Sequence, residues 1–310
     1  MIIQGGAIVS EVVDAAYGNE TQVVTGNCNC IGTLGATLGG GYGRLMGLYG
    51  LGVDNILSLR LVTALGTLIT VNPEDADLWW ALRGAGPNYG IVTSVTMKVY
   101  LVPTAQNRAW LGPLIFSEDK IEALVQAIDN LDLQPRMAIF IYFAISGPPN
   151  YTPSVITISF YLGNETEGRA AFTSIFIVGP VTEQTSWTAY NTVNAGSDSF
   201  CVKGGRKPSY TAGLAKMDPA TWRAIWNEYN TFLQNLGTEN TTVLVECYSL
   251  YKAMSIGDAS SSYAFRSSNK YNAVLNTWYA DASLDSKAEA FGSLVRSLWR
   301  SGGGLPSNRA

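Results

Sequence analysis

The chain has 310 residues, of which 47% are apolar and 14% charged, and its formal net charge is −4. This composition excludes an intrinsically disordered chain, and the absence of a Lys/Arg cluster argues against a nucleic-acid partner. No apolar run is long enough to span a bilayer, so we expect no membrane segment in this sequence. The length allows one large domain or two of medium size.

Histidine is absent from the sequence. Proton transfer would therefore fall to Tyr, Glu, Asp or Lys, and the most common metal ligand is missing. Four cysteines occur, at Cys28, Cys30, Cys201 and Cys247. Cys28 and Cys30 are too close in an extended segment to pair easily, and four cysteines in so long a chain do not indicate a disulfide scaffold. Without histidine or a second cysteine pair we expect no zinc site.

The compartment is left open by two conflicting signals. N-x-S/T sequons, which are weak evidence for secretion, begin at Asn19, Asn150, Asn164 and Asn240. The first residues, MIIQGGAIVSEVVDAA, lack the basic and apolar regions of a signal peptide. We expect a secreted protein only if a signal peptide lies upstream of Met1.

Up to Pro103 the predicted elements are short. In chain order they are a helix whose apolar face runs from Ile8 to Ala16, strands over 22–25, 57–64 and 67–71, a helix over 78–83 and a strand over 91–100. A tight turn at Leu65-Gly66 joins two of the strands. Asp77 is expected to cap the second helix and Gly84 to end it.

After Pro103 longer strands alternate with amphipathic helices, which predicts a domain boundary near that proline. In order, the expected elements are a helix from the Ser117 cap to Ile128, strands over 136–145 and 154–162, a helix from Asp218-Pro219 to Gly237, strands over 241–249 and 271–279, and a helix over 288–300. A turn at Gly147-Pro148-Pro149 separates the first two strands. The pattern indicates an α+β fold.

Glycines cluster between Gly26 and Tyr100, in bursts over 32–43 and 84–90. Such bursts mark backbone that takes positive φ or lies directly against a ligand. No window has the G-x-G-x-x-G of a Rossmann loop or the Gly-Lys-Ser/Thr of a Walker loop. Single bursts are more often tight turns, but the order and spacing of several favour a ligand loop that carries Cys28.

Four motifs in this block resemble, in order, the flavin-binding domain of the vanillyl-alcohol-oxidase superfamily, and more narrowly the berberine-bridge-enzyme-like oxidoreductases. They are Gly26-Asn27-Cys28 with Ile31-Gly32, Gly39 to Gly43 with Arg44, Gly50-Leu51 with Asp54, and Asp77 to Gly84 followed by Asn88 to Thr93. A fainter likeness to the family's substrate domain lies at Ser262 to Arg266 with Tyr271-Asn272.

The resemblance implies a partial PCMH-type FAD-binding domain over 1–103 and a substrate domain over 104–310, in which helices flank an antiparallel sheet. It implies FAD as cofactor, with Cys28 able to form a thioether to flavin C6. The residues expected to face the cofactor are Gly26, Cys28, Ile31, Gly32, Gly35, Gly40, Gly41, Gly90, Ile91 and Val92. Asp54 and Arg83 are expected to hold loops through charge-assisted hydrogen bonds.

The same resemblance implies hydride transfer to flavin from an alcohol, a sugar or a secondary metabolite, with O2 as final acceptor. We expect a monomer whose partner is this small-molecule substrate. A base must then take a proton from the substrate. In an alternating strand Glu246 and Tyr248 point the same way, so they are the predicted catalytic residues. Burial would raise the pKa of Glu246 towards a useful range. The alternative is that Glu246 pairs with a cation and Tyr248 lies in the core.

The sequence also departs from the family. No counterpart is found for the family's first loop, which cradles the FAD diphosphate and carries a histidine anchor, or for its C-terminal return to the flavin domain, because the chain stops at Ala310. A second hypothesis is therefore a truncated relative that keeps the fold without functional FAD binding. A third is a carbohydrate- or small-molecule-binding protein that reuses the substrate domain.

Overall fold

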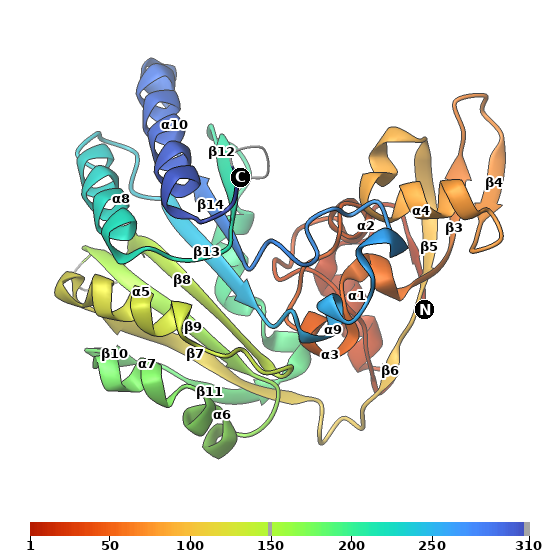
Figure 1. Ribbon diagram of the computed structural model, residues 1–310, viewed down its shortest axis with the longest axis horizontal. Helices are drawn as coiled ribbons and strands as arrows, with labels where there is room; N and C mark the ends of the chain where they lie inside the picture. The colour runs from red at the N-terminus through yellow and green to blue at the C-terminus, as the bar shows by residue number, and fades with distance from the viewer. Residues whose placement is uncertain (148–150, 307–310) are drawn as a thin grey trace.

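The computed structural model describes residues 1–147 and 151–306 and has two lobes (Figure 1). The first lobe contains a four-stranded antiparallel sheet in the order β1-β5-β3-β4 and a separate pair formed by β2 and β6. Its elements are β1 (Ile2–Gln4), α1 (Val9–Tyr17), β2 (Thr21–Gln22), α2 (Thr33–Leu38), α3 (Met46–Tyr49), β3 (Ile56–Val62), β4 (Leu68–Val71), α4 (Ala76–Ala85), β5 (Ile91–Met97) and β6 (Tyr100–Leu101).

The second lobe is built on a larger antiparallel sheet in the order β10-β7-β9-β8-β13-β14-β12, with β11 also paired to β7. Its elements are β7 (Arg108–Phe116), α5 (Ile121–Asp129), β8 (Met137–Ile145), β9 (Pro153–Tyr161), α6 (Glu165–Ala171), α7 (Thr173–Val178), β10 (Thr182–Glu183), β11 (Ser186–Ala189), β12 (Ser209–Leu214), α8 (Pro219–Phe232), β13 (Thr242–Tyr248), α9 (Tyr251–Met254), β14 (Tyr271–Asn276) and α10 (Asp285–Gly302).

The two faces of the large sheet bury different cores. Helices α5, α8 and α10 cover one face, where Val243, Val245 and Cys247 of β13 join a core with the buried stripes of these helices. On the other face, Tyr248 of β13 and Phe140 of β8 pack with residues of the first lobe. Because side chains alternate along a strand, β13 presents its even-numbered residues towards the first lobe.

Most predicted elements are confirmed to within a few residues, and the α+β class with them. The Asp218 carboxylate caps α8 by accepting from the backbone N of Thr221, and the predicted turn at Leu65-Gly66 joins β3 to β4. Helix α8 ends at Phe232, before the predicted stop at Gly237, and β14 ends at Asn276. The predicted turn at Gly147-Pro148-Pro149 reaches beyond the described residues, and the domain boundary near Pro103 stays a prediction.

Two expectations for the first lobe are wrong. Asp75, not Asp77, precedes α4, and the strand predicted over 91–100 is interrupted, because β6 leaves β5 to pair with β2. Gly84 adopts φ +144° inside a kink of α4, and a Cβ there would approach the backbone N of Tyr263 to 2.3 Å. A larger residue at this position would therefore strain the backbone and push a remote segment away.

A buried ion pair holds the first lobe to the segment between β13 and β14. Arg266 donates from Nη1 and Nη2 to the two carboxylate oxygens of Asp54 at 2.6 and 2.8 Å. The two side chains are 0% and 3% exposed. Arg83 donates to the backbone carbonyl of Ser260 in the same segment. Asp54 and Arg83 thus hold loops, as predicted.

A disulfide that the sequence analysis did not predict joins Cys30 to Cys201, which are 171 residues apart. It ties the loop over 26–32, called the glycine-rich loop below, to a short 3₁₀ segment over Ala195–Cys201. Cys28 and Cys247 are the free cysteines among the residues described. A pairing across this separation depends on the tertiary fold, which is why cysteine spacing gave no sign of it.

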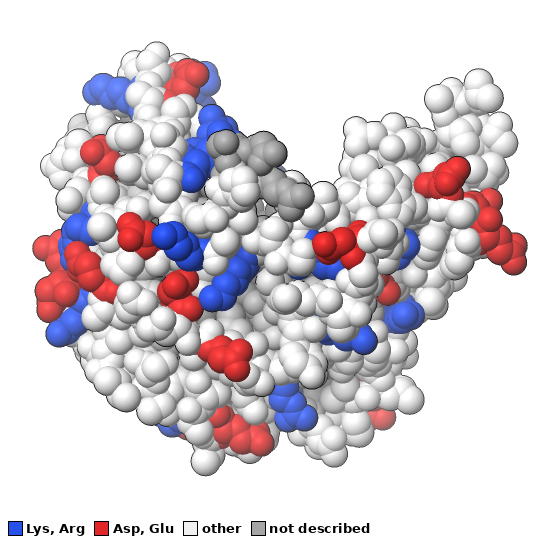
Figure 2. Space-filling model, viewed as in Figure 1, with Lys and Arg blue, Asp and Glu red and all other residues white. Residues whose placement is uncertain are grey.

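Surface charge is mixed on the face shown in Figure 2, where Lys and Arg side chains alternate with Asp and Glu. Within residues 1–147 and 151–306, no helix combines the length and apolarity needed to cross a membrane.

The Asp54–Arg266 pair predicts a large stability loss in Asp54→Asn. The substitution leaves the Arg266 charge buried without a counter-charge, which costs about 3–5 kcal/mol. Urea unfolding followed by circular dichroism measures the loss. Glu165→Gln, which removes a half-exposed partner of Arg169, is the matched control and should cost less than about 1 kcal/mol. Equal effects of the two substitutions would contradict the role of the buried pair.

The disulfide predicts a thiol count. Without reductant, the denatured flavin-free protein should expose two reactive thiols, and four after reduction, because Cys30 and Cys201 are bonded to each other. Cys201→Ser should lower the free energy of unfolding by about 2–4 kcal/mol. Titration with a chromogenic disulfide reagent reads the count, with Cys28→Ser as the control that should show one thiol before reduction. Four thiols in unreduced wild-type protein would refute the bond.

Candidate functional site

A cavity of about 500 Å³ lies between the glycine-rich loop and the helix-free face of the large sheet. This volume is in the range of small-molecule sites, roughly 300–1,000 Å³. From the loop it is lined by Gly26, Cys28 and Ile31, and from β13 by Glu246 and Tyr248. These five residues, predicted separately as cofactor-facing or catalytic, are therefore brought together across the two lobes.

The remaining predicted residues do not line this cavity. A Cβ built at Gly32 or Gly35 would meet no atom within 4 Å, so the space in front of both is open. At Gly40 and Gly41, by contrast, a Cβ would approach the Tyr263 ring to 2.8 Å and the Gly52 Cα to 2.7 Å. Packing within the protein is thus enough to explain these two glycines.

The predicted segment Gly90, Ile91 and Val92 lies at the start of β5, where Ile91 is 71% exposed. A Cβ at Gly90 would approach the carbonyl oxygen of Val62 on the neighbouring strand to 2.4 Å. Close strand packing therefore accounts for the glycine here, and a cofactor role for the segment stays a prediction.

Glu246 is the carboxylate of the cavity. Burial raises the pKa of Glu246 above its ordinary range, while the Tyr248 hydroxyl, the Arg44 charge and the Asn27 amide oppose that shift. No ion pair is formed by Glu246 within the described part of the chain, so the alternative of a cation partner is not met. A carboxyl group with a raised pKa is, once ionised, a stronger base than an exposed carboxylate.

Tyr248 is held by a chain of hydrogen bonds from the glycine-rich loop. Asn27 donates from Nδ2 to the Tyr248 hydroxyl and accepts on Oδ1 from the backbone N and Nη1 of Arg44, both at 3.3 Å. The phenol is 3% exposed, packs edge-on against Phe140 with ring centroids 5.4 Å apart, and burial raises its pKa well above the ordinary value. It therefore stays protonated and able to donate.

Cys28 lies half-buried beside the disulfide. Its Sγ atom is 3.6 Å from that of Cys30 and 4.0 Å from that of Cys201. Burial raises the pKa of the Cys28 thiol, and the nearby carboxylates of Asp198 and Glu246 raise it further, against a lowering hydrogen bond from the Cys30 backbone. At neutral pH the sulfur is therefore a thiol, and it becomes a nucleophile only on losing its proton.

Sequence reasoning missed several residues of this site. Asn27 and Arg44 stand inside the quoted motifs, but only the cysteine and the glycines there were interpreted chemically. Phe140 of β8, Leu244 of β13 and Trp278, which follows β14, line the cavity from the second lobe. The signal that could have found Phe140 and Leu244 is the alternation of side chains along β8 and β13, once it is known which face of the sheet lacks helices.

Comparison with known proteins agrees with this geometry. A family model described as an FAD binding domain matches residues 1–72. The FAD-linked oxidoreductase OXR1 of Pyricularia oryzae is 32% identical over 96% of this chain and 60% of its own length. The FAD-linked oxidoreductase hasG of Aspergillus fumigatus is 30% identical over 96% of this chain and 65% of its own. The chain thus spans somewhat less than two thirds of these curated relatives.

Solved structures share the fold. The BBE-like 1 protein of Physcomitrella patens superposes with a TM-score of 0.82 at 19% identity, covering 98% of this chain and 67% of that one. A xylooligosaccharide oxidase from Myceliophthora thermophila, solved with xylobiose, gives a TM-score of 0.82 at 18% identity, covering 99% and 67%. The chain is therefore similar to curated FAD-linked oxidoreductases, carries a match to an FAD binding domain over residues 1–72, and shares the fold of berberine-bridge-enzyme-like structures.

Proposed function

We propose that the chain is an FAD-dependent oxidoreductase that takes hydride from a small organic substrate, with O2 as the final acceptor. In this proposal the protein acts as a monomer and needs no partner besides the substrate. The observation that supports this most directly is the cavity in which Cys28 of the loop and Glu246 of β13 line the same space. FAD, when bound, supplies a two-electron hydride acceptor. The substrate is an alcohol, a sugar or a secondary metabolite.

The residues present fit one end of a flavin. The cavity walls include the apolar or aromatic side chains of Phe140, Leu244 and Trp278, as a planar ring requires. Asn27 and Cys28 supply a polar edge, and the open space at Gly32 and Gly35 leaves the loop backbone accessible. In this proposal the loop from Gly26 to Ile31 holds the ring system, with Cys28 as its covalent anchor.

Glu246 acts as the general base in this proposal. Its ionised carboxylate accepts the proton that the substrate loses from an O–H or N–H group, and burial makes it a stronger base than an exposed carboxylate. Tyr248, kept neutral by burial, donates its hydrogen bond to the Glu246 carboxylate and so positions the base. Asn27 fixes the phenol in place through its amide N–H.

Covalent anchoring through Cys28 predicts a colour test. The purified protein should be yellow, and the colour should stay with the pellet after acid precipitation. In Cys28→Ala the flavin should be released into the supernatant, because the thioether cannot form. Cys247→Ala, at the buried cysteine in the core, is the control and should keep the colour in the pellet.

Yellow supernatant from the wild type would exclude the covalent bond but not FAD binding. A colourless protein that takes up no added FAD would overturn the oxidoreductase proposal and favour the truncated, non-functional relative.

The raised pKa of Glu246 predicts a pH profile. Because the base acts ionised, flavin reduction should accelerate as pH rises through this pKa, on a limb displaced above the range of an exposed carboxyl group. Glu246→Gln should slow reduction by about 10²–10⁴ and flatten the limb. Anaerobic stopped-flow absorbance measures the rate with any alcohol or sugar that bleaches the wild-type flavin. Glu239→Gln, at an exposed site, is the control; an unaltered limb in Glu246→Gln would reject this base.

A further inference from the structure

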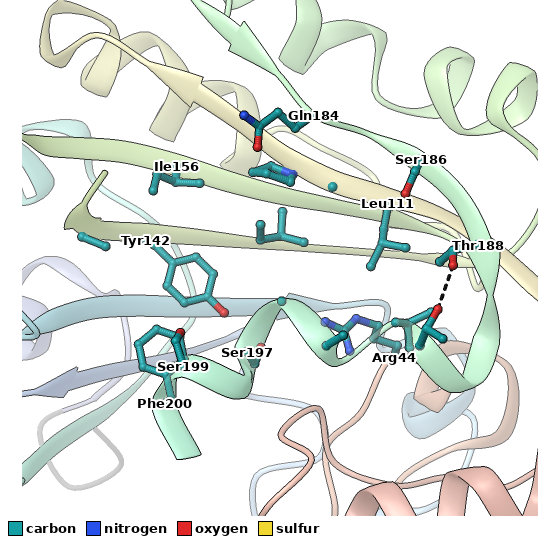
Figure 3. A pocket seen from close by; sticks show the side chains of 18 residues that line it. Arg44, Leu111, Tyr142, Ile156, Gln184, Ser186, Thr188, Ser197, Ser199 and Phe200 are labelled. Carbon is teal, nitrogen blue, oxygen red and sulfur yellow. Dashed lines mark hydrogen bonds between the residues drawn. The ribbon is translucent and has the colours of Figure 1, made fainter. Parts of the chain in front are cut away.

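A second cavity, of about 530 Å³, lies beside the first on the same face of the large sheet. The segment that follows β11 forms one wall, and strands β7, β8 and β9 form the other (Figure 3). The two cavities share Tyr142, Ser197 and Phe200. The Tyr142 and Phe200 rings stack with centroids 6.3 Å apart, so they separate the two spaces.

Arg44 is the one charged side chain among the described residues that line this cavity. In Figure 3 it lies at one end of the space, near Ser197 and Thr188. The residue is 5% exposed, and its Nε is buried without any hydrogen-bond partner. No carboxylate in the described parts of the chain forms an ion pair with it.

The groups that Arg44 contacts are all neutral; the Glu246 carboxylate is near enough for the Arg44 charge to lower its pKa, but the two form no ion pair among the described residues. Its Nη1 donates to the side-chain oxygens of Asn27 and Asn194, and its guanidinium lies 5.0 Å from the Phe140 ring centroid and 5.6 Å from that of Phe160. Amide oxygens and aromatic faces offset part of the cost of burying a cation. The full compensation of a buried charge comes from an opposite charge with matched hydrogen bonds.

The chemistry of the other lining residues indicates which kind of ligand could carry that opposite charge. A guanidinium is complementary to a carboxylate, which can accept two parallel N–H bonds. The lining around Arg44 is largely apolar, with Leu111, Pro113, Ile156, Ile158 and Phe200. Ser186 and Thr188 of β11 contribute hydroxyl groups to the lining (Figure 3), which leaves room for weakly polar substituents.

We propose that this cavity binds a small molecule with an apolar body and one carboxylate, and that the carboxylate pairs with Arg44. This ligand site is separate from the cavity of Cys28 and Glu246, and it requires no flavin chemistry. Occupancy would neutralise the one buried guanidinium that has no ion partner in the chain as described.

Calorimetric titration of the full chain with 2-naphthoate, and with its neutral isostere 2-naphthamide, tests the proposal. Wild-type protein should bind naphthoate at least about tenfold more tightly than naphthamide, because a hydrogen-bonded charge pair is lost in the amide. Arg44→Gln should abolish that preference, and Arg44→Lys should restore part of it. Circular dichroism and the unfolding midpoint confirm that each variant is folded.

A variant that leaves Arg44 intact guards against a folding artefact. Ala144→Phe places a ring inside the cavity, which Ala144 lines, and should weaken the binding of both probes at least about tenfold. Leu236→Phe, at a position 95% exposed, is its control and should leave both unchanged. Equal affinity of wild type for the two probes, or an unchanged preference in Arg44→Gln, would overturn the proposal.

The titration is repeated in the presence of FAD, so that the two proposals can fail separately. Unchanged naphthoate affinity supports an independent site, whereas competition by FAD would assign the cavity to the cofactor and refute this inference. Naphthoate binding by a colourless protein that takes up no FAD would sink the oxidoreductase proposal and leave the carboxylate site standing.

Discussion

The arrangement of both cavities depends on the hydrogen bonds by which Asn27 joins two buried side chains, Arg44 and Tyr248. Its amide oxygen accepts from the backbone and guanidinium of Arg44, and its amide nitrogen donates to Tyr248 on β13. One side chain of the glycine-rich loop thereby fixes both a cation of the first lobe and a phenol of the second. Because Arg44 and Tyr248 are 5% and 3% exposed, leaving either of them unpaired would be costly. The loop is thus held in register with the sheet.

The large sheet supplies the second constraint. Its antiparallel strands direct alternate residues to opposite faces, and three helices cover only one of them. The other face is left to the first lobe, whose short elements and loops do not fill it completely. The first cavity lies between this face and the first lobe, and the second lies between the face and the segment that follows β11. The Cys30–Cys201 bond holds the end of that segment, which lines both cavities.

Features that depend on local sequence pattern, such as strand alternation and motif order, could be predicted from the sequence alone. Alternation along 241–249 placed Glu246 and Tyr248 on one side, and the order of glycine motifs led to the family. The disulfide and the Asn27–Tyr248 bond join residues 171 and 221 positions apart, so neither has a local signature. The atoms that crowd Gly40 and Gly41 belong to Tyr263 and Gly52, so this packing has no local signature either, and a cofactor role for the two glycines stays a prediction.

The central claim is that the loop around Cys28 and strand β13 enclose one reaction site. A crystal structure of the FAD-loaded protein tests it most directly. The account predicts density for the isoalloxazine between Cys28 and Glu246, with the ring within reach of both. A flavin ring bound elsewhere, with this cavity filled by side chains, would contradict it.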